Sequence, residues 1–363
     1  MADDTLKAKT SSTHTSGELV HDVGADPLDP DTDAGILVKV RDTTDPQYVP
    51  RSGGMPEDRP IEELLRCGVI NLDKPAGPTS HEVASWAKRI LHIERAGHSG
   101  TLDPSVTGVL PIMTGDATKV VRALLLAPKE YICLMHLHHP ATDSAVRAVC
   151  SEFVGRIYQR PPVKSAVKRR LRVRTIYYLK IEEIAGRDVL FTVGCEAGTY
   201  IRKLCHDIGI ALGTGAHEAE LRRTKTGPLD ETSLVTLHDL RDAYVEWEEN
   251  GDETLLRSMV HPVELALTHL PMVEIRDSAV DAICHGASLA VPGVLAMSAR
   301  IKAGSVVAVY TRKGEVVSLG TACIAAAEVM TCRTGIAVRT DRVVMRAGTY
   351  PKGWVTSRKA EVV

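Results

Sequence analysis

One acidic residue, Asp103, stands in a short loop whose other residues are suited to fixing its position. The run 98–112 reads HSGTLDPSVTGVLPI. Gly100 and Gly108 allow backbone conformations that other residues resist, and Pro104 fixes the chain direction directly after the acid. A carboxylate held in this way can act as a nucleophile or as a general base. The residues alone leave open the alternative that Asp103 only closes a turn, because Asp-Pro pairs favour turns.

The segments around this loop have the patterns of regular elements that could hold it in place. A strand is expected at 69–72, followed by a helix whose first residues, Thr79 and Glu82, match a capping box. The apolar run after the loop reads as a buried strand, which would anchor it. Elsewhere the periodicity predicts helices at 116–125, 143–153, 199–213, 236–247 and 254–267, with Asp116 and Thr199 as caps, and strands at 131–137, 176–184 and 189–195. Because these elements do not repeat with β-α-β spacing, a mixed α+β domain is expected.

The pattern changes after Pro271, where short alternating strands separated by glycines take over. Strands are predicted at 272–276, 305–310, 315–319 and 336–339, with one helix at 278–285. A small β-barrel of roughly 85 residues is the natural interpretation.

Length and composition predict a globular protein of two or three domains. The chain has 363 residues, of which 44% are hydrophobic and 25% charged. It has no apolar run as long as a bilayer span and no signal-peptide pattern at its start, so a soluble cytoplasmic protein without a membrane partner is expected. The eight cysteines contain no Cys-x-x-Cys pair, which predicts neither a disulfide framework nor a structural metal.

The charge is unevenly distributed along the chain. Residues 1–60 carry 12 acids and 6 bases, whereas 153–181 contain nine Lys or Arg and no acid. Tyrosines interleave these bases. A solvated basic face is the simplest explanation of a charge run, but one this dense and free of acids is better suited to a phosphate backbone. The candidate RNA contacts within it are Arg160, Lys164, Lys168, Arg169 and Arg172.

Four separated stretches read VINLDKP at 69–75, GHSGTLDP at 97–104, KEY at 129–131 and GTYIR at 198–202. Together and in this order they resemble the motifs of the TruB-type pseudouridine synthases. Four more look like dyskerin and its archaeal counterparts, the catalytic subunits of box H/ACA guide-RNA particles: QRPP at 159–162, SAVKR at 165–169, RVRTIY at 172–177 and DSAV at 277–280. The resemblance runs from about residue 66 to 354, and the absence of a long Lys-rich tail points to the archaeal type.

The resemblance implies a fold and a domain plan. It implies an α+β catalytic domain with a mixed, mainly antiparallel sheet, followed by a PUA β-barrel that binds RNA. The expected divisions are a disordered acidic tail at 1–35, an extended arm at 36–60, the catalytic domain at 61–270, the PUA domain at 271–357 and a short tail at 358–363. The segment 136–140, HLHHP, departs from the glycine-containing form of the family, which we regard as peripheral.

The resemblance also implies roles for individual residues. Pseudouridine formation breaks the glycosidic bond of uridine and rejoins the base through C5, so no cofactor or metal is required. Asp103 would do the chemistry, either as a nucleophile or as a base, with Arg202 keeping it ionised and Tyr131 stacked on the extruded uracil. His98 would order the flipped nucleotide, and Tyr200 and Leu221 would wall the pocket, although ordinary core packing explains the last two nearly as well.

Three functions compete at this stage. The leading one is an RNA-guided synthase that modifies ribosomal RNA in an H/ACA particle, with guide RNA, substrate RNA and small protein subunits as partners. A stand-alone synthase for the T-loop uridine of tRNA is the alternative within the class. A non-catalytic RNA-binding scaffold is the alternative of another class, which Asp103, Tyr131 and Arg202 argue against. In the barrel, basic residues including Lys313 would bind guide RNA.

Overall fold

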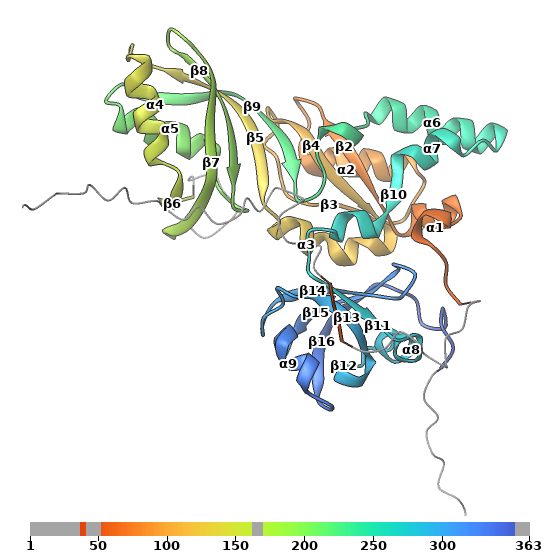
Figure 1. Cartoon of the computed structure of the whole chain (residues 1–363). Coiled ribbons are helices and arrows are strands. Elements are labelled where there is room, and N and C mark those ends of the chain that lie inside the picture. The colour runs from red at the N-terminus through yellow and green to blue at the C-terminus, as the bar shows by residue number, and fades with distance from the viewer. Residues whose placement is uncertain (1–36, 41–51, 162–169, 353–363) are drawn as a thin grey trace, which may run out of the picture.

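The chain folds around two β-sheets, seen in the upper and lower parts of Figure 1. The structure is a computed structural model that describes residues 37–40, 52–161 and 170–352. The expected tails at 1–35 and 358–363 therefore lie outside the described residues, as do residues 36 and 41–51 of the expected arm. Among the described helices, none combines the length and the apolar character needed to cross a bilayer.

The larger sheet is mixed and mainly antiparallel, as expected. Its strands run in the order β10-β2-β4-β9-β5-β8-β7-β6, and β3 pairs with β4 off this path. Within this sheet, only the β4–β9 pair is parallel among the described strands. The strands are β2 Gly68–Lys74, β3 Ala96–His98, β4 Thr107–Thr114, β5 Lys129–Leu137, β6 Gly155–Gln159, β7 Arg172–Ala185, β8 Asp188–Cys195, β9 Ala216–Thr226 and β10 Val260–Pro262.

Helices cover the two ends of this sheet with separate cores. At one end α2 and α6 pack on β2 and β4, and at the other α4 and α5 pack on β5 and β8 (Figure 1). The capping box of Thr79 and Glu82 that opens α2 is confirmed. The helices are α1 Ile61–Arg66, α2 Ser80–Ile90, α3 Val121–Leu126, α4 Asp143–Glu152, α5 Ile201–Ala211, α6 Leu237–Asn250 and α7 Thr254–Met259.

The smaller sheet belongs to the C-terminal part and takes in one strand from the N-terminal part. Its order is β1-β13-β11-β14-β15-β16-β12, with β11–β14 as the parallel pair. Strand β1 pairs antiparallel with β13, so Leu37 faces Ser298. The elements are β1 Leu37–Lys39, β11 Met272–Ile275, α8 Asp277–Cys284, β12 Leu289–Ala290, β13 Val294–Ser298, β14 Val306–Tyr310, β15 Val316–Ala322, α9 Ala326–Thr331 and β16 Ile336–Val343.

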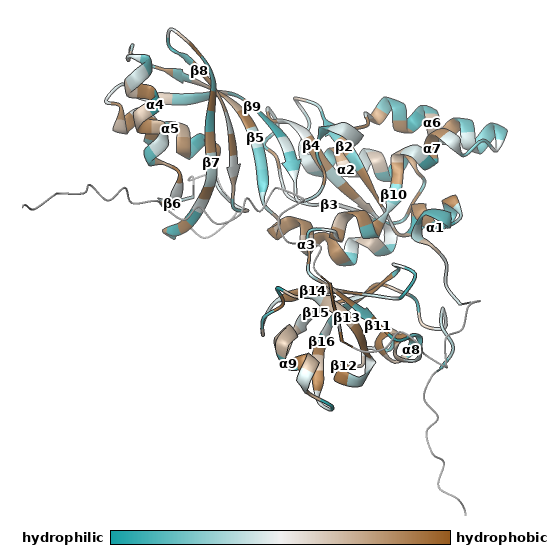
Figure 2. Ribbon diagram, viewed as in Figure 1, coloured by the Kyte–Doolittle hydropathy of each residue, from teal (hydrophilic) through white to brown (hydrophobic). Residues whose placement is uncertain are grey.

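The two sheets share one apolar core at their junction. Val69 and Val109 of the larger sheet and Tyr310 of the smaller one belong to the same buried cluster. Brown, hydrophobic segments accordingly occur in β2, β4 and β14 in Figure 2. Glu264 adds polar contacts across this junction, because it accepts hydrogen bonds from Arg59 at 2.7 and 2.9 Å and from the amide of Val316 at 2.9 Å.

Some expected elements differ from those observed. The helix expected at 254–267 is wrong: α7 ends at Met259, β10 then pairs with β2, and a 3₁₀ turn follows at Val263–Leu267. Pro262 explains the break, since it lacks the N–H that a continuing helix requires. Strand β9 carries so many charged residues that no apolar alternation predicts it.

The two expected helix caps at Asp116 and Thr199 are also wrong. The Thr199 hydroxyl donates to the Glu196 carbonyl at 2.7 Å, and α5 begins only after Tyr200. Asp116 lies in a 3₁₀ turn before α3 and pairs with Arg66 at 2.8 Å. Both side chains thus bond to other partners, a local carbonyl in the case of Thr199 and the distant Arg66 in the case of Asp116.

Candidate active site

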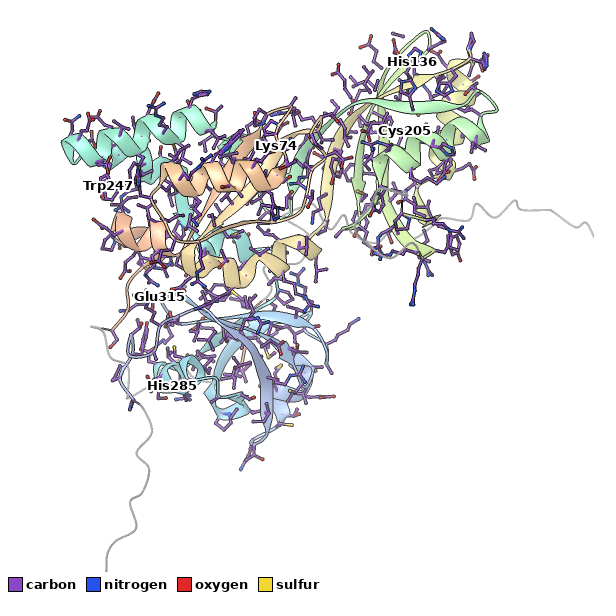
Figure 3. The ribbon with its side chains drawn as sticks, turned by 180° about the vertical axis from the view of Figure 1, so that it is seen from behind. Lys74, His136, Cys205, Trp247, His285 and Glu315 are labelled. Atoms are coloured by element: carbon purple, nitrogen blue, oxygen red, sulfur yellow. The ribbon has the colours of Figure 1, made fainter. Side chains whose placement is uncertain are left out.

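A buried lysine at the end of β2 fixes the loop that carries Asp103. Lys74, at the end of β2, is fully buried, and its ammonium group donates to the carbonyl oxygens of Pro75, Pro104 and Val106 at 2.9 to 3.0 Å. Figure 3 labels Lys74 within the larger sheet. Burial lowers the pKa of Lys74, while the Asp103 charge opposes that shift. The lysine therefore fixes the backbone on both sides of the turn that carries the acid.

A buried serine on α2 fixes the same loop from the other side. The Ser80 hydroxyl donates to the Leu102 carbonyl at 3.1 Å and accepts from the Leu102 amide at 2.8 Å. Gly108, which has a φ of +99°, follows the loop, and a Cβ there would lie 2.2 Å from the Arg223 carbonyl oxygen. Glycine is therefore required where β4 meets β9.

The structure brings Asp103 and Arg202 together, as the sequence predicts. Nη2 of Arg202, in the first turn of α5, donates to Oδ2 of Asp103 at 2.7 Å. Both side chains are 56% exposed. The pair thus combines a short ion pair with free access for a substrate, which an inert buried bridge would not allow.

A second carboxylate, Glu218 on β9, lies close to the same guanidinium group. Its Oε1 is 3.7 Å from Nη2 of Arg202, and its side chain is only 7% exposed. Burial raises the pKa of Glu218, Arg202 lowers it, and the Asp103 charge raises it further. One cation therefore stands between an exposed and a buried carboxylate.

Tyr131 lies on β5 directly opposite a buried arginine. It pairs in register with Arg223 on β9, which is 1% exposed and donates from Nε to the Val109 carbonyl at 2.7 Å. Burial raises the pKa of Tyr131, and the charge and hydrogen bonding of Arg223 oppose this. Burial also lowers the pKa of Arg223. The phenol is thus kept neutral beside a fixed positive charge.

Lys129, two residues before Tyr131, closes the end of α3. Its ammonium group donates to the carbonyl oxygens of Leu124, Leu125 and Ala127 at 2.7 to 2.9 Å. The carbonyls at the end of a helix lack the amides of a further turn, and the lysine supplies them with a donor, in addition to the Ala127 amide that Leu124 accepts at 3.2 Å. Burial lowers the pKa of Lys129 to about 7, while the three acceptors favour its charged form.

Tyr200 and Leu221 lie close in sequence to the arginines of the site: Tyr200 is two residues before Arg202, and Leu221 is two residues before Arg223. Tyr200 immediately precedes α5, and its backbone is fixed by Gln159, whose Oε1 accepts from the Tyr200 amide at 2.9 Å. Leu221 pairs with Cys133 on β5 and packs against the same core cluster as Tyr131.

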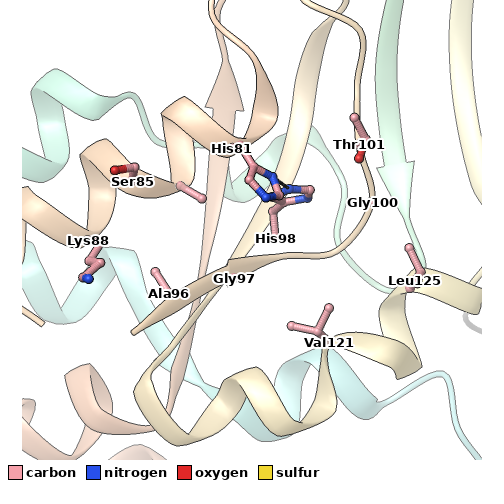
Figure 4. Close-up of a pocket in the computed structure, with 11 residues that line it drawn as sticks. His81, Ser85, Lys88, Ala96, Gly97, His98, Gly100, Thr101, Val121 and Leu125 are labelled. Carbon is pink, nitrogen blue, oxygen red and sulfur yellow. Dashed lines mark hydrogen bonds between the residues drawn. The ribbon is translucent and has the colours of Figure 1, made fainter. Parts of the chain in front are cut away.

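His98 lies beside a cavity rather than at the Asp103–Arg202 pair. Its Nε2 is 2.8 Å from Nδ1 of His81 on α2, and burial lowers the pKa of His98. Figure 4 shows both rings between α2 and the loop. The cavity has a volume of about 510 Å³, and its lining includes Ser85, Lys88, Thr101 and Leu125.

The expected RNA-binding residues are only partly described. Arg160 is exposed and Arg172 is half-buried in β7, whereas Lys164, Lys168 and Arg169 lie outside the described residues. Lys313 donates to the carbonyls of Ser52 and Gly53, so its ammonium group holds the N-terminal segment. These six residues remain predictions as RNA contacts.

Sequence reasoning assigns no role to four of the residues that shape this site: Lys74, Lys129, Glu218 and Arg223. Lys74 and Lys129 do belong to the family-like motifs quoted above, which was the available signal. Charged residues inside otherwise apolar strand patterns were a further signal, because such side chains must find partners when buried. Their partners are distant in sequence, so the contacts themselves could not be read from the pattern.

Four family models match this chain. They are described as the TruB family pseudouridylate synthase N-terminal domain at 88–201, the tRNA pseudouridylate synthase B C-terminal domain at 202–268, the PUA domain at 271–344 and the DKCLD domain at 27–84. Together they span both sheets.

Curated relatives and solved structures agree with these models. "Probable tRNA pseudouridine synthase B" of Methanosarcina barkeri is 58% identical over 86% of this chain and 91% of its own length. The counterpart in Methanopyrus kandleri is 57% identical over 89% and 95%. A Cbf5-Nop10-Gar1 complex contains a chain that matches with a TM-score of 0.85 and 53% identity, over 88% of this chain and 98% of that one. An H/ACA ribonucleoprotein bound to a substrate RNA gives a TM-score of 0.83 and 50% identity, over 89% and 99%. The chain belongs to the TruB family of pseudouridine synthases.

Proposed function

We propose that this chain converts uridine to pseudouridine in ribosomal RNA as the catalytic subunit of an H/ACA guide-RNA particle. The observation that carries the proposal is the joint match of both sheets to chains solved in a Cbf5-Nop10-Gar1 complex and in an H/ACA particle with substrate RNA. At least 98% of each of those chains is covered. The partners are accordingly guide RNA, substrate RNA and small protein subunits.

The chemistry follows from the geometry of the candidate site. The reaction breaks the bond between C1′ and N1, turns the uracil, and joins C1′ to C5, so that C5 loses a proton and N1 gains one. Asp103 is the reactive group, acting as a nucleophile at C1′ or as a base on the sugar. Arg202 balances its charge, and Tyr131 stacks on the flipped base. A base must leave the RNA stack before these groups can reach it, which fits the exposure of the ion pair.

A stand-alone activity on tRNA is the second candidate. The names of the curated relatives favour it, since they refer to tRNA pseudouridine synthase B. The two candidates share one active site and differ in how the target uridine is brought to it. The non-catalytic scaffold is disfavoured, because Asp103 and Arg202 form the short pair that the chemistry requires.

We place the activity in the cytoplasm, where cysteines remain reduced. All eight cysteines are free thiols in the structure. Thiols in a protein of this size are typical of a reducing compartment.

The test supplies the protein with each substrate separately. The chain is assembled with a guide RNA and the small protein subunits and incubated with a matching ribosomal RNA fragment, while the chain alone is incubated with tRNA transcript. Pseudouridines are mapped in both reactions. We expect modification of the guided uridine only when guide RNA is present. Modification of tRNA by the chain alone, with none in the guided reaction, would establish the second candidate instead.

A further inference from the structure

A bulge in β9 turns a carboxylate toward the reactive pair. Across the β5–β9 ladder, Leu134 faces Glu220 and Met135 faces Glu218, so Ala219 is an extra residue. In a ladder without the bulge, regular alternation would place Ala219 rather than Glu218 on the face shared with Leu221. That face is covered by α5, which explains why the Glu218 side chain is only 7% exposed.

From this face, the Glu218 carboxylate lies close to the same Arg202 nitrogen atom that the Asp103 carboxylate contacts from its loop. Nη2 of Arg202 is 2.7 Å from Oδ2 of Asp103 and 3.7 Å from Oε1 of Glu218. A buried carboxylate is costly unless a cation or hydrogen-bond donor accompanies it. Arg202 is the cation that accompanies Glu218, so its guanidinium group interacts with two carboxylates at once.

We propose that Glu218 is a positioning residue that shares the Arg202 guanidinium with Asp103 and thereby sets how strongly this cation holds the reactive carboxylate. The inference rests on the proposed chemistry of Asp103. A carboxylate whose charge is fully balanced by arginine is a weaker base and a weaker nucleophile. When Glu218 is ionised it draws part of the guanidinium charge to itself, and Asp103 becomes more reactive.

The groups that face Glu218 determine the pH range in which it ionises. They are Arg202 from α5, Asp103 from the loop, and Tyr131 and Cys133 from β5. Burial and the Asp103 charge raise the pKa of Glu218, so Glu218 ionises at a higher pH than an ordinary glutamate side chain. The effect of Glu218 on the rate is therefore absent at low pH and present at neutral pH.

Neutral variants of Glu218 test this directly. Single-turnover rates of the assembled particle with saturating substrate RNA are measured between pH 5 and pH 8 for the parent, Glu218→Gln and Glu218→Met. We expect rates that equal the parent near pH 5 and fall about three- to tenfold below it near pH 7.5, because the neutral side chain cannot share Arg202. Glu218→Met covers the case in which a buried amide impairs folding, since an apolar side chain of similar size is often tolerated at a buried ionic site.

Glu220→Gln, on the exposed face of the same strand, is the matched control and should follow the parent at every pH. A parent-to-variant ratio for Glu218 that is the same at every pH would show a merely structural role and overturn the proposal. Equal rates throughout would overturn it as well. Failure of the proposed function is distinguishable, because the parent particle would then form no pseudouridine at any pH.

Discussion

At the scale of single residues, the site depends on one carboxylate that is both exposed and rigidly held. Replacing Asp103 by asparagine keeps the shape of the side chain but removes its ability to attack or to accept a proton. We expect Asp103→Asn to lower the single-turnover rate by at least about a hundredfold. RNA affinity, measured by filter binding, should stay close to that of the parent. Residual turnover within tenfold of the parent would contradict the assignment of Asp103 as the reactive group.

The Arg202 side chain should control the pH at which activity appears. Arg202→Met removes the only positive charge that is within 4 Å of Asp103 and Glu218 among the described residues. Two neighbouring carboxylates without a cation repel each other, so the site gains its full negative charge only at a higher pH. We expect a severe loss of rate and a shift of the acidic limb of the pH–rate profile to higher pH. An unchanged acidic limb would count against the ion pair as a functional contact.

Residues in contiguous motifs could be predicted at this scale, but residues that act through distant partners could not. Asp103, Tyr131 and Arg202 each lie in a short family-like run, and the structure joins Asp103 to Arg202 as expected. Glu218 was not predicted, because its burial depends on a bulge and on the packing of α5. No local sequence pattern indicates the bulge in β9 or the packing of α5 on it.

At the scale of elements, the loop owes its rigidity to side chains from β2 and α2. Lys74→Met keeps most of the side-chain volume but removes the donor to the carbonyl oxygens of Pro75, Pro104 and Val106, of which, among the described residues, only Pro104 also accepts from a backbone amide, that of Gly77. Such a loss costs about 2 to 4 kcal/mol of unfolding free energy. We expect a lower midpoint in chemical denaturation and a fall in activity, since the turn that carries Asp103 would relax.

Lys88→Met is the matched control, because Lys88 is exposed on α2 and should change stability by less than about 0.5 kcal/mol. If Lys74→Met matched this control in both stability and activity, the loop would not depend on Lys74. The comparison separates loss of the three hydrogen bonds from the general effect of removing a lysine.

The elements with clear local signals were predicted well, and those defined by pairing were not. The capping box that opens α2 is present as expected, because Thr79 and Glu82 satisfy each other within one turn. Strand β9 was missed since its charged residues find their partners on other elements of the folded chain, such as Arg202 of α5 for Glu218 and Asp73 of β2 for Arg222. The helix expected over 254–267 is not formed along its whole length, because a helix cannot continue regularly through Pro262. Residues 260–262 instead form β10, which pairs with β2.

At the scale of the whole molecule, the two sheets are not independent bodies. Their shared core includes Val109 and Leu319, and Glu264 bonds across the junction to Val316. Removal of residues 271–363 would therefore expose apolar surface of the catalytic part as well as remove the smaller sheet. A role for that sheet in RNA binding is better tested with surface substitutions that leave the junction intact.

We expect the smaller sheet to anchor the guide RNA through exposed basic side chains. Arg339 and Arg342 lie exposed on β16, remote in sequence from Asp103. Each phosphate contact contributes roughly one released counterion, so Arg339→Ala and Arg342→Ala should each weaken guide binding and reduce its salt slope by about one. Arg241→Ala, at an exposed position of α6 in the larger sheet's layer of helices, should leave both quantities unchanged. Guide affinity and salt slope identical to the parent in both β16 variants would mean that the guide is anchored elsewhere. The smaller sheet would then act only through the core it shares with the catalytic part.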